Sequence, residues 1–388
     1  MPLITPSKSQ LVQLADLHKT SFQDGDFYID FFFKNKLNLA DCFVNIELDG
    51  TLSGVLYARP LKFKILKRVV VIPFITGVAT NPNFRNRGIA SSLLNEACDY
   101  YAKNKYPCVM LYPFNHDFYR RQKFQTVNYF YKPFLESYNR DEAPNYDYLL
   151  GKLIKILPTN FSAEKLKIED FASCKKIYDC ASKNESFFQI RTPSYFRMLL
   201  EEYLQDAGSG ILFKHFGKPY GYLLFSQEGI KEMVFSHKSA DKFLPIFSEI
   251  LPSLECPINF RDSSTRDNLK PDCPFVLSSD IEYCMARICH IKKAIKIAIY
   301  DKKSPKKVCI ILEDYMFKIW IKNGRAQFVK IFQKKKYHSE LKKLNDKDFH
   351  IISTSKESLT TALLGNVKFN PLYKNIFYVY NILMYEKY

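Results

Sequence analysis

Apolar positions in the first 142 residues follow two periods. They recur at every second residue where strands are expected and at three- or four-residue intervals where helices are expected. The pattern predicts, in chain order, a helix at 9–22, strands at 42–48, 53–66 and 71–80, a helix from about Gly88, a strand at 108–114, a short helix at 116–122 and a strand at 126–134. The helix from Gly88 rests on the spacing of Ile89, Leu93, Leu94, Ala97 and Tyr101. Elements in this order predict an α/β fold with a mixed sheet.

A second segment, residues 157–279, repeats the early part of the first. The stretch GILFKHFGKPYGYLLFS has the same strand, turn and strand as VNIELDGTLSGVLYA. The corresponding glycines are Gly50 and Gly54 in the first copy and Gly217 and Gly221 in the second. Repetition over this length predicts a duplicated fold. No glycine-rich turn precedes the next helix of the second copy, so any chemistry of that turn belongs to the first copy.

The last segment, from about Ile281, predicts an α+β domain. Its strands are VCIILED, MFKIWIKNG and AQFVKIF, and a helix-prone stretch follows at 354–365. Thr354 and Glu357 have the spacing of a capping box at the start of that helix. The chain therefore divides into three predicted domains, at 1–150, 151–280 and 281–388.

The bulk composition agrees with this division. A chain of 388 residues with 47% hydrophobic residues is long and apolar enough for two or three packed domains. Its ten cysteines include no CxxC and no Cys/His zinc spacing, so we expect reduced thiols and no metal. The N-terminus has no secretory apolar region, and the most apolar run, VVVIPFITGVA, is too short to span a bilayer. We therefore expect a cytoplasmic protein without a membrane partner.

The net charge of +17 is unevenly distributed. Residues 291–345 contain 16 Lys and Arg but only 4 Asp and Glu. A basic surface can attract nucleic acid, anionic lipid or a phosphorylated cofactor. The chain has no aromatic RNA-binding motif that would turn charge into recognition, so a solvated surface is favoured over nucleic-acid binding.

Residues 85–91, between a predicted strand and a predicted helix, carry the clearest chemistry. The first turn of a helix leaves backbone N–H groups without partners, and these groups with the helix dipole bind phosphate. Gly88 and Ala90 leave room for a ligand at the main chain, and Arg85 and Arg87 add positive charge. A capped helix with two solvated arginines fits the spacing equally well. The loop is neither G-x-G-x-x-G nor a Walker loop, which argues against dinucleotide and nucleoside-triphosphate binding.

The motif R-x-x-G-x-A at 85–90 follows ITGVAT and precedes CVMLYPFNHDFYRRQKF. This arrangement resembles the acetyl-CoA site of the GNAT N-acetyltransferase superfamily, and the whole chain resembles the Eis (enhanced intracellular survival) family. That family has an active GNAT domain, a degenerate second GNAT domain and a sterol-carrier-protein-like α+β domain. The stretch YCMARI at 283–288 resembles the start of that third domain. The resemblance implies tandem GNAT folds with mixed sheets, acetyl-CoA as co-substrate and a homo-oligomer, commonly a hexamer. It is specific over residues 74–124 and weak beyond about residue 290.

The resemblance also assigns roles to single residues. The pantetheine arm of acetyl-CoA would lie along the main chain of Val78, Ala79 and Thr80, and main-chain N–H groups near Val78 would stabilise an oxyanion. The pyrophosphate would be bound by Arg85, Asn86, Arg87, Gly88, Ile89, Ala90 and Ser91. Phe114 and Asn115 would lie where a strand end meets the cofactor.

Tyr119 stands at the position of the family's general-acid tyrosine. A phenol with an ordinary pKa of about 10 can protonate a departing thiolate, whose conjugate acid has a pKa of about 8.5. The glycine that usually follows this turn in the family is missing from RRQKFQT, so the local turn geometry departs from the family pattern.

The resemblance gives the α-carboxylate of Tyr388 as the base that deprotonates the amine, with a frayed terminus as the alternative. The acceptor would bind near SFQDGDFYIDFFFKN, where Asp24, Asp26 and Asp30 would attract a cationic amine. The walls of that cleft would be Phe27, Tyr28, Phe31, Phe32 and Phe33. A core-packing aromatic cluster with solvated acids is the alternative interpretation.

The sequence therefore predicts an acetyl-CoA-dependent N-acetyltransferase. The acceptor would be an aminoglycoside-, polyamine- or lysine-like amine that attacks directly in a ternary complex, and the sequence does not select among these. Two alternatives stay open. One is a non-catalytic protein that holds a hydrophobic ligand in its C-terminal domain, and the other is a basic protein that associates with nucleic acid.

Overall fold

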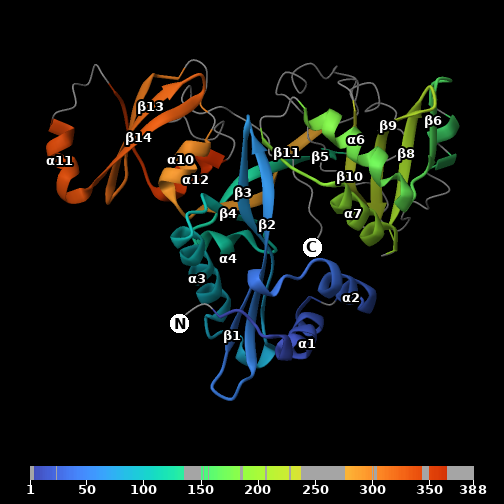
Figure 1. Ribbon diagram of the computed structural model, residues 1–388, viewed down its shortest axis with the longest axis horizontal. Coiled ribbons are helices and arrows are strands. Elements are labelled where there is room, and N and C mark those ends of the chain that lie inside the picture. The colour runs from blue at the N-terminus through green and yellow to red at the C-terminus, as the bar shows by residue number, and fades with distance from the viewer. Residues whose placement is uncertain are drawn as a thin grey trace. The chain divides into compact units, whose positions relative to one another are not determined.

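The computed structural model divides into two compact units, each described here by itself (Figure 1). The first contains residues 1–128 and 283–382, and the second contains residues 129–282. The residues that the structure describes are 4–22, 24–134, 150–151, 153–155, 157–183, 187–205, 208–226, 229–236, 276–298, 300, 304–342 and 349–364.

The N-terminal part of the chain has the predicted order of helices and strands with one addition, the helix α2 (Asp26–Asn35), which was not predicted as a separate element. Its elements are α1 (Leu11–Phe22), α2 (Asp26–Asn35), β1 (Cys42–Ile46), β2 (Leu52–Ile65), β3 (Arg68–Thr80), α3 (Ile89–Lys103), β4 (Cys108–Leu111), α4 (His116–Arg121) and β5 (Gln125–Phe134). Gly88 is the N-cap of α3, as the spacing of apolar residues predicts. The mixed α/β fold is therefore confirmed.

The strands of this part form a mixed sheet in the order β1-β2-β3-β4-β11-β5. Strands β1, β2 and β3 are antiparallel, β3 and β4 are parallel, and β11 (Val276–Ile288) is antiparallel to β4. Met285 to Ile288 of β11 pair with Leu111 to Cys108 of β4. A segment far downstream in the chain thus completes the sheet of the first 134 residues.

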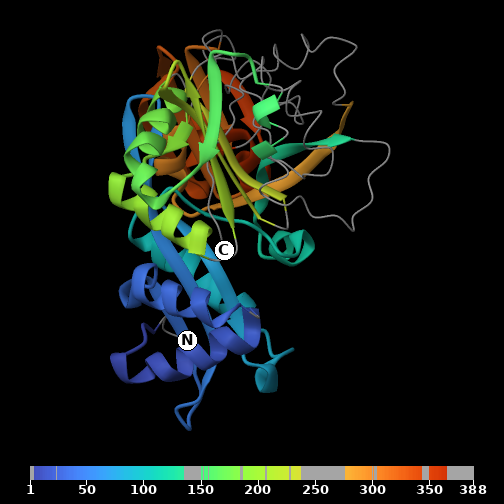
Figure 2. The ribbon, with the colours of Figure 1, turned by 90° about the vertical axis from the view of Figure 1, so that its right-hand side faces the viewer.

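Helices cover both faces of this sheet because alternate residues of β2 point to opposite sides. Leu56 and Ala58 pack in one core cluster with residues of α3, and Val55 and Tyr57 pack in another with α1 and α2. Figures 1 and 2 show α3 on one side of the long β2–β3 hairpin and α1 and α2 on the other. This hairpin is the platform on which the candidate site is built.

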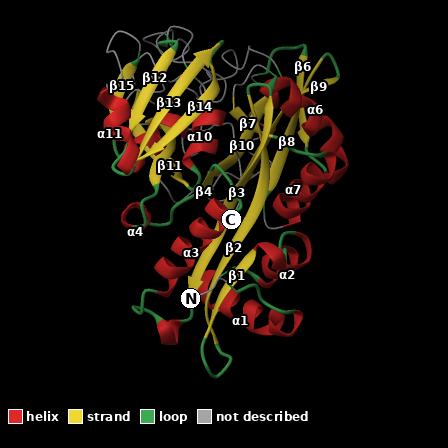
Figure 3. Ribbon diagram, turned by 60° about the vertical axis from the view of Figure 1, so that its left-hand side comes forward, coloured by secondary structure: helices red, strands yellow, loops and turns green. Residues whose placement is uncertain are grey.

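The second unit repeats the early topology of the first (Figure 3). Its main elements are β6 (Phe161–Lys165), α6 (Phe171–Ser182), α7 (Pro193–Gln205), β8 (Ser209–His215), β9 (Lys218–Ser226) and β10 (Gly229–Phe235). The sheet has the order β10-β9-β8-β6, and α6 and α7 pack against it. In the first unit an antiparallel bridge from Ile4 to Val44 takes the place of β6. The helix predicted after β10 lies outside the described residues.

The paired glycines of the two copies have matching conformations. Gly50 and Gly217 lie in the hairpin turns with φ of +85° and +73°, where a side chain would be strained. Gly54 and Gly221 lie on the second strand of each hairpin, in contact with a packed side chain. The structure therefore agrees with the predicted duplication at the level of single residues.

The C-terminal part of the first unit is a separate sheet with helices. Its elements are α10 (Ile291–Ile297), β12 (Lys307–Ile311), β13 (Tyr315–Lys322), β14 (Arg325–Gln333), α11 (Lys334–Lys342), β15 (His350–Ser353) and α12 (Lys356–Leu364), with strand order β14-β13-β12-β15. The predicted capping box is wrong by one residue. The Oγ of Ser355, not of Thr354, accepts a hydrogen bond from the Ser358 N–H, because α12 begins at Lys356.

No helix among the described residues is long and apolar enough to cross a bilayer.

Candidate acetyl-CoA site

The site begins where β3 and β4 separate. The two strands pair only at Phe74 with Met110 and at Ile75 with Leu111, where β4 ends. Tyr57 of β2 pairs with Gly77, and Ala58 pairs with Ile75, so Thr76 is an extra residue in β3. An extra residue of this kind is a β-bulge, which bends its strand and ends regular pairing. Beyond Thr76, β3 keeps β2 as a neighbour on one edge, and no described strand pairs with the other.

The open edge of β3 offers unpaired backbone groups. The N–H of Asn81 donates to the Ser53 oxygen of β2 at 3.0 Å. Because successive residues of a strand direct their N–H and C=O groups to opposite edges, Val78 and Thr80 direct theirs to the open edge and Ala79 directs its own to β2. Of the three residues expected beside the pantetheine arm, two therefore direct main-chain groups to an edge that no described strand occupies. An extended ligand can bind such an edge as an added strand would.

The loop after β3 presents a row of backbone N–H groups, and we call residues 85–91 the anion cradle. Asn86 and Gly88 have positive φ of 62° and 77°. When residues with negative and positive φ alternate, successive N–H groups point into one concavity that binds anions. Within the described part of the chain, the N–H groups of residues 86–91 have no hydrogen-bond acceptor. Arg85 to Gly88 are exposed, and the Arg87 guanidinium lies 5.0 Å from the centre of the Phe84 ring.

Gly54 of β2 fixes the position of the cradle. A Cβ at Gly54 would lie 2.5 Å from Cγ2 of Ile89 and 3.1 Å from Cδ1 of Leu93. The first turn of α3 therefore packs directly on the main chain of β2. The N–H groups of this turn are therefore held next to the end of β3, at which the open edge of that strand finishes.

Tyr119 lies in α4, in the same core cluster that Val78 and Ile89 pack against. Its side chain is buried, with ring centres 5.5, 5.1 and 5.9 Å from those of Phe114, Phe118 and Phe124. Burial raises the pKa of Tyr119 above its ordinary value, which differs from the unperturbed phenol expected from sequence. Its hydroxyl makes no hydrogen bond to any described residue. The group is therefore a neutral phenol without a hydrogen-bond partner among the described residues.

Phe114 and Asn115 follow the end of β4, as expected. Phe114 is 77% exposed and its ring packs on Phe118 and Tyr119. Asn115 is the N-cap of α4, and its Oδ1 accepts a hydrogen bond from the Phe118 N–H at 2.9 Å. Asn115 thus positions the helix that carries Tyr119.

The three aspartates expected at the acceptor site have different surroundings. Asp24 Oδ2 is 2.9 Å from Nε2 of the buried His18, and Asp26 is 2.6 Å from the Lys19 ammonium. Asp30 is exposed on α2. Two of the three carboxylates are therefore already engaged by side chains of α1.

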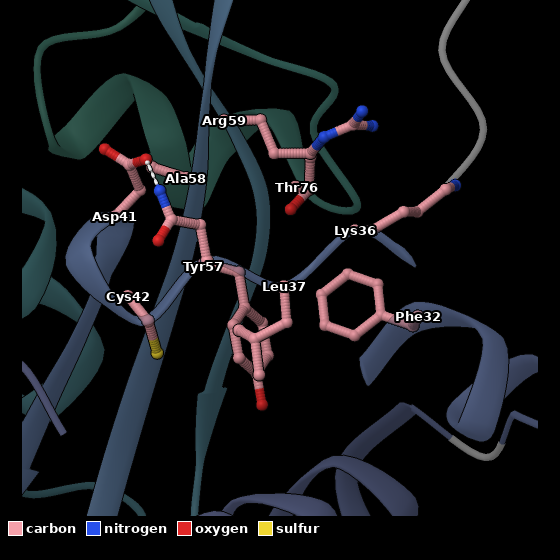
Figure 4. Close-up of a pocket in the computed structure, with 10 residues that line it drawn as sticks. Phe32, Lys36, Leu37, Asp41, Cys42, Tyr57, Ala58, Arg59 and Thr76 are labelled. Carbon is pink, nitrogen blue, oxygen red and sulfur yellow. Dashed lines mark hydrogen bonds between the residues drawn. The ribbon is translucent and has the colours of Figure 1, made fainter. Parts of the chain in front are cut away.

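The expected aromatic wall is mostly core. Tyr28, Phe31 and Phe32 are buried, whereas Phe27 is 40% exposed. Only Phe32 of this set lines the narrow hollow drawn in Figure 4. The other lining residues are Lys36, Leu37, Asn38, Asp41, Cys42, Tyr57, Ala58, Arg59 and Thr76.

Sequence reasoning missed Thr76 and Tyr57 in this hollow. Each has a buried hydroxyl without a hydrogen-bond partner among the described residues. Such groups are costly to bury unpaired. No sequence signal could have found Thr76, because its place in the bulge depends on how β3 pairs with β2. The base expected at Tyr388 lies outside the described residues.

Residues 3–127 match the family model described as the acetyltransferase (GNAT) domain. No curated protein sequence matches the chain. Several solved structures share its fold over nearly the full length. A conserved protein of Enterococcus faecalis V583 described as "Probable N-Acyltransferase" has a TM-score of 0.68 at 16% identity, over 96% of this chain and 93% of that one.

A GCN5-related N-acetyltransferase from Anabaena variabilis has a TM-score of 0.66 at 16% identity, over 93% of this chain and 89% of that one. Eis1 from Mycobacterium abscessus has a TM-score of 0.61 at 14% identity, over 94% and 89%. At such identities these likenesses show the fold alone, so membership of the Eis family stays a prediction. Residues 3–127 of this chain are thus similar to a GNAT acetyltransferase domain.

Proposed function

We propose that the protein is an N-acetyltransferase that transfers the acetyl group of acetyl-CoA to an amine. One observation carries this proposal. The open edge of β3 beyond Thr76 leads into the anion cradle, whose six N–H groups at residues 86–91 lack acceptors among the described residues. An extended arm that ends in a pyrophosphate matches an unpaired strand edge followed by an anion site.

The protein's own groups would bind and orient acetyl-CoA, which supplies a reactive thioester. The cradle and its arginines bind the pyrophosphate, and the N–H groups of Val78 and Thr80 fix the pantetheine arm and face the thioester carbonyl. An amine that attacks this carbonyl creates an oxyanion, which N–H donors stabilise. Most of the rate enhancement comes from holding the amine and thioester in line.

Tyr119 would act on the departing sulfur. Its raised pKa keeps the phenol protonated wherever an amine nucleophile is used. Full proton transfer to a thiolate whose conjugate acid has a pKa of about 8.5 is then uphill. The hydroxyl therefore acts foremost as a hydrogen-bond donor that stabilises the thiolate as it leaves.

The acceptor is an amine of the aminoglycoside, polyamine or lysine class, approaching from the side of α1 and α2. Of the three expected aspartates, Asp30 is exposed and has no ion pair with a described residue, and the α-carboxylate of Tyr388 is the proposed base. We also propose, from the resemblance alone, three domains at 1–150, 151–280 and 281–388, with a sterol-carrier-protein-like fold in the third. A cytoplasmic homo-oligomer, commonly a hexamer in the Eis family, belongs to the same proposal.

The direct test combines binding and turnover. Acetyl-CoA at a hundredfold excess over its Kd stabilises a binding protein by about 2.7 kcal/mol, a clear shift in melting temperature. A panel of amines is then assayed for acetyl-CoA-dependent release of free thiol. Binding with turnover of one amine class supports the proposal and names the acceptor. Absence of any stabilisation by saturating acetyl-CoA would refute it and favour the alternative of a hydrophobic-ligand carrier.

A further inference from the structure

One guanidinium joins three elements around the candidate site. The Nη1 of Arg287, on β11, donates to Oδ1 of Asn95 at 2.6 Å and to the carbonyl oxygen of Gln122 at 3.0 Å. Asn95 in turn donates through Nδ2 to the Ser91 carbonyl at 2.9 Å and to Oε1 of Gln122 at 3.1 Å. All four residues are half-buried. They form a closed network between α3, the end of α4 and β11.

The α3 end of this network lies at the anion cradle. Ser91 is the last residue of the cradle and lies in the first turn of α3, and Asn95 lies one turn further along. The hydrogen bond from Arg287 to Asn95 therefore holds the start of α3 against β11.

The α4 end of the network lies just beyond Tyr119. Helix α4 has only six residues, too few to be stable without outside contacts. Gln122 is its C-cap, and its N–H donates to the carbonyl of Tyr119 at 3.0 Å. The last carbonyls of a helix lack intrahelical partners, and a cation there satisfies them and opposes the helix dipole. Arg287 supplies both effects to α4 from outside the helix.

Arg287 itself is carried on a rigid strand. Its neighbours Ala286 and Ile288 are fully buried, and Arg287 pairs with Val109 of β4. The guanidinium therefore stays in a fixed position relative to the sheet. Movement of either helix would break a charge-assisted hydrogen bond, which is stronger than one between neutral groups.

We propose that Arg287 is a positioning residue that fixes the distance between the anion cradle and Tyr119. This inference rests on the proposed acetyltransferase function. If the cradle binds the pyrophosphate and Tyr119 faces the sulfur, one ligand spans both, and its two contacts form together only at one separation. Loss of Arg287 releases both helices and so weakens acetyl-CoA binding and the chemical step together.

Arg287→Met tests this with the aliphatic packing of the side chain retained. We expect kcat/KM to fall by about tenfold or more, with a raised KM for acetyl-CoA and a lowered kcat. Arg287→Lys keeps a charged donor and should recover part of the loss. Arg68→Met is the matched control, because the Arg68 Nη1 ties β3 to the Lys296 carbonyl of the C-terminal part at 2.7 Å, away from both helices. Arg68→Met should lower the melting temperature without changing KM or kcat.

A second variant keeps the idea testable if Arg287→Met does not fold. Asn95→Ala retains a good helix former and the bond from Arg287 to Gln122 while it releases α3. We expect Asn95→Ala to raise the KM for acetyl-CoA and the Kd for CoA measured by calorimetry, with a smaller effect on kcat. Unchanged KM and Kd in Asn95→Ala would overturn the inference, as would a rate loss in Arg287→Met no larger than in Arg68→Met.

Hydrogen exchange separates this inference from the proposed function. Without any substrate, Arg287→Met should increase amide exchange in peptides that cover residues 118–124, and Arg68→Met should not. Increased exchange in Arg287→Met, together with an unmodified protein that fails to bind CoA, would support the network and refute the acetyltransferase. Unchanged exchange in Arg287→Met, together with an unmodified protein that binds CoA, would refute the role of Arg287 and leave the acetyltransferase standing.

Discussion

The Gly54→Ala variant, which adds one methyl group, should weaken ligand binding beyond what its loss of stability explains. A Cβ there would lie 2.5 Å from Cγ2 of Ile89, at the first residue of α3, and 3.3 Å from the Ala79 carbonyl oxygen. Ile89 cannot swing aside cheaply, because a β-branched side chain in a helix has one strongly preferred rotamer. The Gly54→Ala variant must therefore move the start of α3 away from β2.

The size of the displacement follows from the contact distances. Non-bonded carbons are most stable at about 3.5–4.0 Å, so α3 has to move by about 1 Å. Overpacking of this kind destabilises a protein by about 1–3 kcal/mol. The same movement carries the anion cradle away from the open edge of β3. We expect the Kd for acetyl-CoA to rise about tenfold, which corresponds to about 1.4 kcal/mol.

The chain contains its own control for this experiment. Gly221 occupies the equivalent position in the second copy, where a Cβ would lie 2.2 Å from Cδ1 of Phe235. Gly221→Ala should therefore also destabilise the protein, but it overpacks a unit to which no part of the candidate site belongs. Calorimetric titration with CoA and thermal unfolding are measured for both variants and for the unmodified protein.

Two results would contradict the reasoning. If Gly54→Ala binds CoA as tightly as the unmodified protein despite a lowered melting temperature, the contact between Gly54 and Ile89 does not set the position of the cradle. If Gly221→Ala weakens CoA binding as much as Gly54→Ala does, the effect is general loss of stability and says nothing about the site.

Four further outcomes are expected. Tyr119→Phe should lower kcat strongly and leave the Kd for CoA unchanged, and full activity would refute its role at the sulfur. Because burial raises the pKa of Tyr119, the phenol stays protonated to higher pH, so kcat should show no alkaline decline from this group below about pH 10. A decline of kcat below about pH 10 that disappears in Tyr119→Phe would contradict the role of a protonated Tyr119. A fragment of residues 1–150 should aggregate when expressed alone, because it lacks the β11 segment that covers the fully buried β4, and a soluble, cooperatively unfolding fragment would be contrary evidence. Residues added after Tyr388 should impair turnover if its α-carboxylate is the base, and an active C-terminally extended enzyme would remove that idea.

Local features of the fold were accessible from the sequence. The helix from Gly88 was predicted from apolar spacing, and α3 begins at Ile89. The duplication was visible in the paired glycines, and glycine is the residue best suited to the positive φ of Gly50 and Gly217 in the hairpin turns. These features are set by neighbours a few residues away, which a pattern of residue types records.

Other features of the candidate site could not be found in this way. Asp24 and Asp26 looked available as acceptor-binding groups, but His18 and Lys19 of α1 lie against them. Tyr119 looked like an ordinary phenol until its burial among three phenylalanines raised its pKa. Burial and partners of this kind depend on how helices pack, which residue spacing does not state.

By itself, the sequence determined most of the helices and strands of the first 134 residues, the repeated hairpin and the loop whose N–H groups and arginines suit an anion. Those properties arise from backbone geometry within one strand, one turn and the first turn of one helix. Only the tertiary structure decided that β3 bulges at Thr76 and leaves its edge open, that β11 completes the sheet, and that Arg287 ties α3 to α4. Each of these depends on contacts between residues far apart in the chain, and such contacts form only when the whole unit packs together.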